Sequence, residues 1–206
     1  MGVIRAMSAG AIAALACSSA AFGADVAGSV SRVQGAAFGV VDGARQQLDL
    51  GAQVYVGEAV ATGADARLAV TLADGTLLTL GENASLTLDT FVYDPAGANA
   101  LHAIVVGAFR YASGKLGPAA TRTASITTPA ATIGVRGTNF WGGPVDGQTG
   151  FVLFEGAIDV TVGATTVIVE NPGTGVALDP GATQPGMVYV WAEDKIQRAV
   201  ATVTFR

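Results

Sequence analysis

The chain has 206 residues, of which 50% are hydrophobic and only 13% are charged. Such a low charge content, combined with so many apolar residues, argues against a disordered protein. The formal net charge of −5 argues against nucleic acid as a partner, because nucleic-acid binding requires a basic surface. Together with 28 glycines, the composition indicates a single domain of short strands and tight turns.

Residues 1–24 have the features of a secretory signal. Met1–Arg5 carries the positive charge, Ala6–Ala21 is apolar and uncharged, and small residues follow up to Ala24. The apolar run is too short and too rich in alanine for a membrane span, and no later stretch reaches the roughly 18 apolar residues that a span requires. We therefore expect an exported protein of the periplasm or cell surface, whose charge changes from −5 to −6 when Arg5 is removed.

Cys17 is the only cysteine of the chain and lies within this segment. Ala14–Cys17 resembles the cleavage box of bacterial lipoproteins, although leucine usually stands one position earlier in that motif. Two outcomes remain open: ordinary cleavage discards the thiol, or Cys17 becomes the lipid-bearing first residue and anchors the protein to a membrane. In both cases the mature chain has no disulfide, so packing and backbone hydrogen bonds must stabilise it.

The first half of the mature chain, residues 26–89, reads as short strands separated by glycine-containing turns. Leu68–Leu72 alternates large apolar with smaller or polar residues, which is typical of a strand. Asp74-Gly75 predicts a tight type I′ turn after it, and Thr76–Leu80 returns as the partner strand. A second Asp-Gly pair at residues 42 and 43 predicts an earlier hairpin between Ala37–Val41 and Gln46–Leu50.

Thr127–Gly142 is the most distinctive stretch of the sequence. Thr128-Pro129 should end the preceding strand, because proline fixes φ and has no N–H for the ladder. Ala131–Val135 is then a short apolar strand, Gly137 breaks it, and Thr138–Trp141 resumes it with β-forming residues that include Phe140.

Arg136 stands between strand residues and a glycine, and two roles are open for it. In a structural role it pairs with a carboxylate or caps carbonyls between layers, and loss of one partner from such a buried pair costs roughly 3–5 kcal/mol. In a functional role it contacts the strand edge of a partner protein or an acidic ligand. We favour the structural role. Trp141 could similarly anchor an interface or pack in the core or at its rim.

The second half of the chain continues the strand pattern. Ala192–Val203 is the only candidate helix, with Ile196, Val200 and Val203 at helical spacing, although a strand at Val200–Phe205 is an alternative. The other expected elements are a loop at Tyr93–Ala100, a strand at Leu101–Tyr111, an exposed loop at Ala112–Thr123, a turn at Gly143–Gln148, strands at Phe151–Phe154 and Ala157–Val162 broken at Glu155-Gly156, a strand at Thr165–Val169, a turn at Asn171–Gly173 and a strand at Met187–Trp191.

Several of these segments follow the motif order of a known family. Gly51–Gly63 has the form G-x-x-V-x-x-G-x-x-V-x-T-G, Ala64–Gly75 leads into Asp-Gly, and Gly81–Leu86 has the form G-x-N-x-x-L. Thr128–Phe140 has the form T-P-x-A-x-x-x-V-R-G-T-x-F, in which Val135, Arg136, Gly137 and Thr138 form the V-R-G-T core, and Phe154–Val160 follows. Over about residues 28–181 the chain therefore resembles the FecR domain of bacterial sigma-factor regulators of the iron-dicitrate type.

The resemblance implies an all-β fold that is elongated, with solenoid-like coiling of short strands; a compact β-sandwich is the alternative. We expect a signal peptide at 1–24, the FecR-like domain at 25–190 and a C-terminal tail at 191–206. Sigma regulators of this kind carry a cytoplasmic domain and a membrane helix ahead of the module. We find neither here, and therefore expect the exported sensing or binding module without that signalling output.

Residues for catalysis are scarce. His102 is the only histidine and is expected to be structural or exposed at the start of a strand. No pair of carboxylates, calcium loop or phosphate-binding glycine loop is apparent, so we expect no enzyme activity, metal or cofactor.

Three functions are carried forward. The first is a protein- or ligand-binding or sensing module of the envelope, with another envelope protein as its expected partner, and the second is a structural component that associates with itself through strand edges. The third is a carbohydrate-active hydrolase of the envelope. Membrane contact is expected only through a lipidated Cys17, and the oligomeric state is open.

Overall fold

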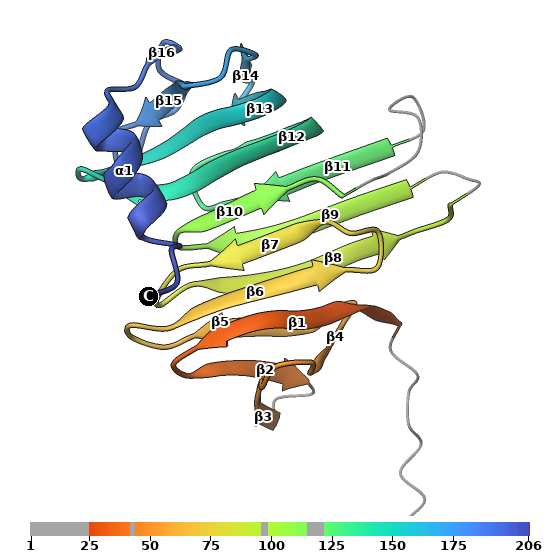
Figure 1. Cartoon of the computed structure of the whole chain (residues 1–206). Coiled ribbons are helices and arrows are strands. Elements are labelled where there is room, and N and C mark those ends of the chain that lie inside the picture. Colours follow the sequence, from red (N-terminus) through yellow and green to blue (C-terminus); the bar gives the residue numbers. More distant parts are fainter. Residues whose placement is uncertain (1–24, 42–43, 96–98, 115–121) are drawn as a thin grey trace, which may run out of the picture.

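The computed structural model of the chain describes residues 25–41, 44–95, 99–114 and 122–206. This part is almost entirely β-structure, with one short helix, so the predicted all-β class is confirmed. Its 16 strands form a single sheet that curls back on itself, and the two halves of the sheet face each other as two layers (Figure 1). The predicted signal segment with Cys17 lies outside the described residues.

The first layer has the strand order β10-β7-β6-β1-β4, and the second layer has the order β11-β9-β8-β5-β2-β3. The first consists of β1 (Val26–Gln34), β4 (Gln53–Tyr55), β6 (Arg67–Leu72), β7 (Leu77–Leu80) and β10 (Phe109–Ala112). The second consists of β2 (Ala37–Val41), β3 (Ala44–Gln47), β5 (Ala59–Thr62), β8 (Ser85–Val92), β9 (Asn99–Val106) and β11 (Arg122–Thr127).

Two long strands join the layers at one end of the stack. β12 (Thr132–Val145) pairs with β11 through its first part and with β10 through its second part, and β13 (Gln148–Val162) pairs along the length of β12. The chain passes repeatedly from one layer to the other, which gives the elongated, coiled stack that was expected (Figure 1). Within the described chain, neighbouring strands pair antiparallel except for β9 with β11, which are parallel. The antiparallel pairing is also a feature of the β-sandwich that was the alternative expectation.

The main hydrophobic core lies between the two layers. Leu68, Val70 and Leu78 contribute to it from the first layer, and Leu86 and Ala103 from the second. These side chains are buried because they alternate with residues on the outer face of each strand. Near β12 the core is aromatic: the Phe109 and Phe140 rings meet edge to face with their centroids 5.6 Å apart.

The last part of the chain extends the sheet beyond β13 and adds a helix that packs against β12. β14 (Thr165–Val169) and β15 (Thr174–Leu178) pair with β13, and β16 (Tyr189–Val190) extends β15. Helix α1 (Glu193–Ala201) then packs against β12, which confirms the predicted helix and rules out a strand at Val200–Phe205. The C-terminal segment, residues 202–206, continues to β1, where the Arg206 N–H donates to Gln34 Oε1 at 2.8 Å.

The predicted hairpin at Asp74-Gly75 exists, but its turn differs from the type I′ prediction. Gly75 has a φ of 81°, whereas Asp74 is not among the described residues with a positive φ. The N–H of Gly75 donates to the Leu72 carbonyl, and the N–H of Leu72 donates to the Thr76 carbonyl, which is typical of a three-residue loop ending in a left-handed glycine. The buried Asp74 carboxylate accepts bonds from the N–H and Oγ1 of Thr76 and thereby fixes this loop.

The type I′ geometry occurs instead at Asp146-Gly147, between β12 and β13. Their φ angles are 51° and 78°, both positive as this turn requires. The earlier hairpin is also present, since β2 pairs with β3, although β3 begins before the predicted Gln46 and residues 42–43 lie outside the described chain.

Other element boundaries also differ from prediction. The expected strand at Leu101–Tyr111 is divided at Gly107, whose φ is 94°. Most of the expected loop after Ala112 falls on residues 115–121, outside the described chain. β15 was not anticipated, and the expected strand at Met187–Trp191 is reduced to β16. The strand at Thr165–Val169 and its turn at Asn171–Gly173 are confirmed.

Candidate functional site

The distinctive stretch around Arg136 forms a corner at which β12 leaves one layer and joins the other. Val135 still pairs with Ala124 of β11, whereas Asn139 pairs with Ala112 of β10. The register against β13 shifts between Arg136 and Asn139, and Gly137 there has a φ of 60°. The predicted break at Gly137 is therefore a bulge within one continuous strand, as is common where strands turn between sheets.

The facing strand has a matching glycine. Gly156 has a φ of 77°, and a Cβ on it would lie 2.1 Å from the carbonyl oxygen of Gly137. The expected break at Glu155-Gly156 is thus also a bulge, and the two strands turn together. Thr138 fixes the corner from inside, because its N–H donates to Ser113 Oγ and its Oγ1 donates to the Glu155 carbonyl at 3.0 and 2.6 Å.

The other residues of the stretch mostly serve the fold. Val135 and Phe140 are buried in the core, and Thr128-Pro129 forms the connection between β11 and β12. The Thr128 hydroxyl donates to the Ala131 carbonyl at 2.9 Å and accepts from the Ala131 N–H at 3.1 Å, which stabilises the turn. Pro129 lines a small, mainly apolar cavity of about 210 Å³ at the end of the strands.

Arg136 is not buried, although the structural role predicted from the sequence assumed a buried ion pair. Its Nη2 lies 2.6 Å from Asp159 Oδ2 on β13, but 64% of the arginine side chain is exposed. It does pair with a carboxylate on the neighbouring strand, as the structural role required. Because exposed ion pairs contribute only about 0–1 kcal/mol, this pair is too weak to lock the stack.

Trp141 is completely buried beneath helix α1 and is not available as an exposed interface anchor. Its indole Nε1 donates to Thr202 Oγ1 at 3.0 Å, and its ring meets that of Trp191 edge to face at 6.2 Å. Val152 and Ala199 belong to the same second apolar cluster, which attaches the helix to the sheet.

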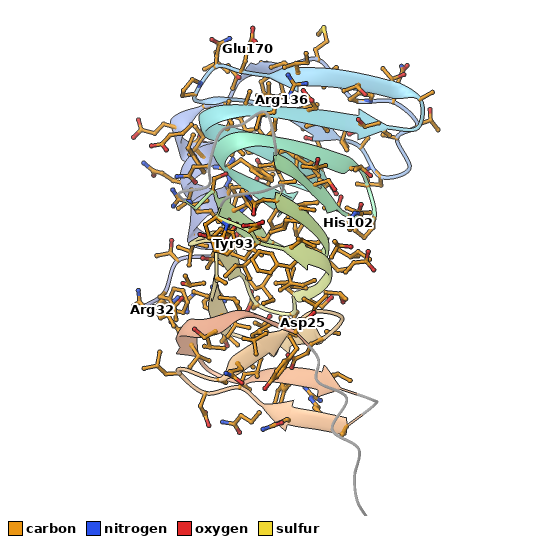
Figure 2. All side chains as sticks on the ribbon, turned by 90° about the vertical axis from the view of Figure 1, so that its right-hand side faces the viewer. Asp25, Arg32, Tyr93, His102, Arg136 and Glu170 are labelled. Atoms are coloured by element: carbon orange, nitrogen blue, oxygen red, sulfur yellow. The ribbon has the colours of Figure 1, made fainter. Side chains whose placement is uncertain are left out.

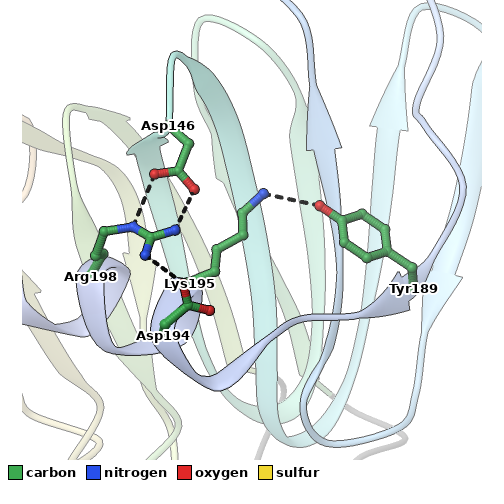
Figure 3. A network of polar contacts seen from close by, with 5 residues as sticks. All are labelled: Asp146, Tyr189, Asp194, Lys195 and Arg198. Atoms are coloured by element: carbon green, nitrogen blue, oxygen red, sulfur yellow. Dashed lines mark hydrogen bonds and ion pairs between the residues drawn. The ribbon is translucent and has the colours of Figure 1, made fainter.

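An exposed polar network fixes the same helix from outside (Figure 3). The Nε and Nη2 of Arg198 donate to the two carboxylate oxygens of Asp146 at 3.0 and 2.9 Å, and its Nη1 donates to Asp194. These bonds lower the pKa of both carboxyls and raise the pKa of the Arg198 guanidinium. Lys195 donates to the Tyr189 hydroxyl at 3.0 Å.

Glu58, which directly precedes β5 of the second layer, has a buried carboxyl group. It is only 6% exposed, and one of its oxygens accepts the Tyr55 N–H at 2.9 Å. Burial raises the pKa of Glu58, and the Tyr55 bond opposes that shift.

The main recess of functional interest is a groove on the outer face of the first layer. It has a volume of about 670 Å³, within the range of small-molecule sites, and one of its walls is formed by Val200, Val203 and Phe205. Its floor is a row of residues opposite one another on neighbouring strands: Arg32 on β1, Ala69 on β6, Thr79 on β7 and Arg110 on β10. Arg32 lies on the first-layer side of the stack in Figure 2.

Both arginines of this row are oriented by neighbours. The Arg32 guanidinium lies 4.3 Å from the centre of the Phe205 ring, and that of Arg110 lies 5.0 Å from the centre of the Phe154 ring. Arg110 Nε also donates to Asn139 Oδ1 at 3.0 Å. Among the described residues that line the groove, none is Asp or Glu. Sequence reasoning missed Arg32 and Arg110, because only the strand register brings them to one face.

His102 lies on the opposite side of the stack from Arg32 (Figure 2). Its ring nitrogens are 3.4 and 3.5 Å from the hydroxyls of Ser125 and Thr127, which gives it polar neighbours on β11. Among the described residues no three His, Cys, Asp or Glu side chains are grouped as a metal site would require. None of the described helices has the length and apolarity to cross a membrane.

The fold and the corner define a class of all-β protein in which one long strand joins two layers. Residues 58–159 match the model of the family described as FecR protein. The chain is therefore a FecR-domain protein, as its motifs indicated.

Two solved structures have a similar fold. Both are described as a "putative anti-sigma factor from Parabacteroides distasonis ATCC 8503", at 1.65 and 2.50 Å resolution. Each has a TM-score of 0.55 and 14% identity, and the match covers 69% of this chain. It spans 64% and 63% of the two solved chains, so about a third of each has no counterpart in the match. A comparison with curated proteins finds no match.

Proposed function

We propose that this chain is an exported binding or sensing module of the bacterial cell envelope, which acts by contact with another protein and catalyses no reaction. The observation that carries this proposal is the FecR match over residues 58–159, placed on an all-β stack with an open outer groove. The description of the two similar structures as an anti-sigma factor supports a regulatory role. In this proposal residues 1–24 direct export, 25–190 form the binding domain and 191–206 form a tail that packs onto it.

Fractionation of cells tests the export step. The full chain should be found in the envelope, and a variant without residues 1–24 should stay in the cytoplasm. Mass spectrometry of the mature amino terminus distinguishes cleavage near Ala24 from lipidation at Cys17. Full-length chain retained in the cytoplasm would contradict the proposal.

Capture from envelope extract tests the binding step. The tagged protein should recover the same partner under repeated conditions, excess untagged protein should compete for it, and the partner should recover this chain in return. Recovery of no specific protein across several growth conditions would refute a role in protein contact.

A structural role through self-association is the second candidate, and the outer edge of β14 favours it. In the described chain β14 pairs with β13 alone, and Ile168 on it is 53% exposed. Unpaired strand edges can join to a second copy. Sedimentation at increasing concentration should then show oligomers that Ile168→Lys abolishes, whereas a strict monomer would eliminate this candidate. A hydrolase requires two facing carboxylates, and the groove supplies no observation in favour of one.

A further inference from the structure

Arg32 and Arg110 have no carboxylate partner within 4.0 Å among the residues that the structure describes. In the described part of the chain, the arginines that form ion pairs within 4.0 Å are Arg136 and Arg198. Arg32 and Arg110 instead contact aromatic rings, and Arg110 uses only its Nε for the bond to Asn139. Their remaining N–H groups are therefore available to a ligand that carries negative charge.

The strand register places these two arginines at the two ends of the row that forms the floor of the groove. Arg32 is opposite Ala69, Ala69 is opposite Thr79, and Thr79 is opposite Arg110. Three steps between neighbouring strands separate the two backbones by about 14 Å. Ala69 and Thr79 have short side chains, so the floor between the two long arginines is low.

The contacts of each guanidinium prepare it for binding. An aromatic ring beside the guanidinium attracts it by a cation–π interaction and restricts its orientation. A planar guanidinium can bind a carboxylate or phosphate through two parallel hydrogen bonds, which are stronger than neutral ones. Leu77, Val203 and Phe205 also line the groove and supply apolar surface for the centre of a ligand.

We propose that this groove binds a small organic molecule with an oxyanion group at each end and an apolar centre. One end is bound by Arg32 and the other by Arg110, while the centre lies over Ala69 and Thr79. This inference goes beyond the protein contact proposed above, because it assigns the same module a small-molecule ligand class and a location for it. Carboxylate and phosphate share the required charge and geometry, and the test separates them.

Calorimetric titration of the purified protein with two series of probes tests this inference. The first series is the linear dicarboxylates from glutarate to suberate, and the second is the alkane bisphosphonates of matching length. One length should bind best, because the two arginines are fixed by their strands. The corresponding monocarboxylate should bind about tenfold or more weakly, since it loses one charge-assisted pair. The better series identifies the oxyanion.

Three variants make the test specific to the groove. Arg32→Gln and Arg110→Gln should each weaken binding of the best probe by about tenfold or more. Arg45→Gln is the matched control, because Arg45 also stacks on an aromatic ring, that of Phe38, but lies on β3 outside the groove. It should leave binding unchanged. Unchanged urea midpoints would show that all three variants keep their fold.

Three results would overturn the inference. They are no binding by any probe of either series, equal binding of the dicarboxylate and the monocarboxylate, or unchanged binding in both Arg32→Gln and Arg110→Gln. Failure here with successful capture of an envelope partner would leave the proposed function intact. Failure of capture with a length-dependent probe signal would refute protein contact while supporting this ligand class.

Discussion

The packing around Gly142 on β12 gives a sharp test of the aromatic core. A Cβ at this position would lie 2.7 Å from two atoms of the Phe109 ring and 2.8 Å from an atom of the Phe151 ring. Both rings are completely buried, so neither can turn toward solvent to make room. Gly134 on the same strand is a matched control, because its Cβ would meet only Asp159, at an ordinary 3.4 Å.

The two alanine variants should therefore change stability in opposite directions. Replacing a strand glycine by alanine removes an entropic cost of about 0.5–1 kcal/mol, and Gly134→Ala should retain much of that gain. Gly142→Ala has the same entropic gain, but it also has an overpacking cost of about 1–3 kcal/mol, because two buried rings must shift away from β12. We expect a net loss of roughly 1–2 kcal/mol for Gly142→Ala.

Urea and thermal unfolding of the two variants and the parent protein provide the measurement. Each kcal/mol corresponds to about 2–4 °C in the midpoint for a chain of this size. Gly142→Ala should fall by several degrees and Gly134→Ala should stay level or rise slightly. Equal midpoints for Gly142→Ala and the parent would contradict the close contact of Phe109 and Phe151 with β12.

Three further predictions address the corner and the buried acid. Arg136→Ala should lower the unfolding free energy by less than about 1 kcal/mol in urea titrations, because the Arg136 side chain that pairs with Asp159 is mostly exposed; a loss of several kcal/mol would instead support the strong structural role. Gly137→Ala should cost about 1–2 kcal/mol for its left-handed conformation, and Gly156→Ala more, because its Cβ also meets a backbone carbonyl; similar unfolding midpoints for the two would refute this. Burial raises the pKa of Glu58 above its ordinary 4.5, so its contribution to stability is fully present below that value and is lost as pH rises through the folded pKa. Glu58→Gln should reduce this loss in a pH series of urea midpoints, and an unchanged pH dependence would contradict it.

The strands could be predicted largely because large apolar residues alternate along them. The hairpin of β6 and β7 follows directly from the pattern at Leu68–Leu72 and the Asp-Gly pair after it. The turn type could not be predicted in the same way. Asp74-Gly75 and Asp146-Gly147 are the same dipeptide, but the first pair belongs to a three-residue loop fixed by a buried carboxylate. Register and burial, rather than the dipeptide, determine which turn forms.

Glycines within the long strands explain the other misplaced boundaries. Gly137 and Gly156 were expected to separate strands, since glycine is unfavourable in a strand interior. Each instead takes a positive φ within a bulge, and the two bulges face each other across β12 and β13. A glycine that ends a strand and a glycine that bends it look alike until its partner strand is known.

The candidate site was less predictable than the fold. Arg136 attracted notice because its immediate neighbours are unusual, but its side chain is mostly exposed and paired with Asp159. Arg32 and Arg110 have no distinctive neighbours in the sequence, and strands β6 and β7 stand between them in the sheet. Their proximity depends on the register of three successive strand pairs, which no local pattern specifies.

This difference separates the residues that make the fold from those that can give it a function. Phe140 and Thr138 are constrained by the core and by the corner, so a substitution at either affects the joint between the layers. Arg32 and Arg110 project from the outer face of the first layer, where a change of side chain leaves the interior packing intact. Relatives could therefore keep the corner and alter the row, and would then share the fold while binding different ligands.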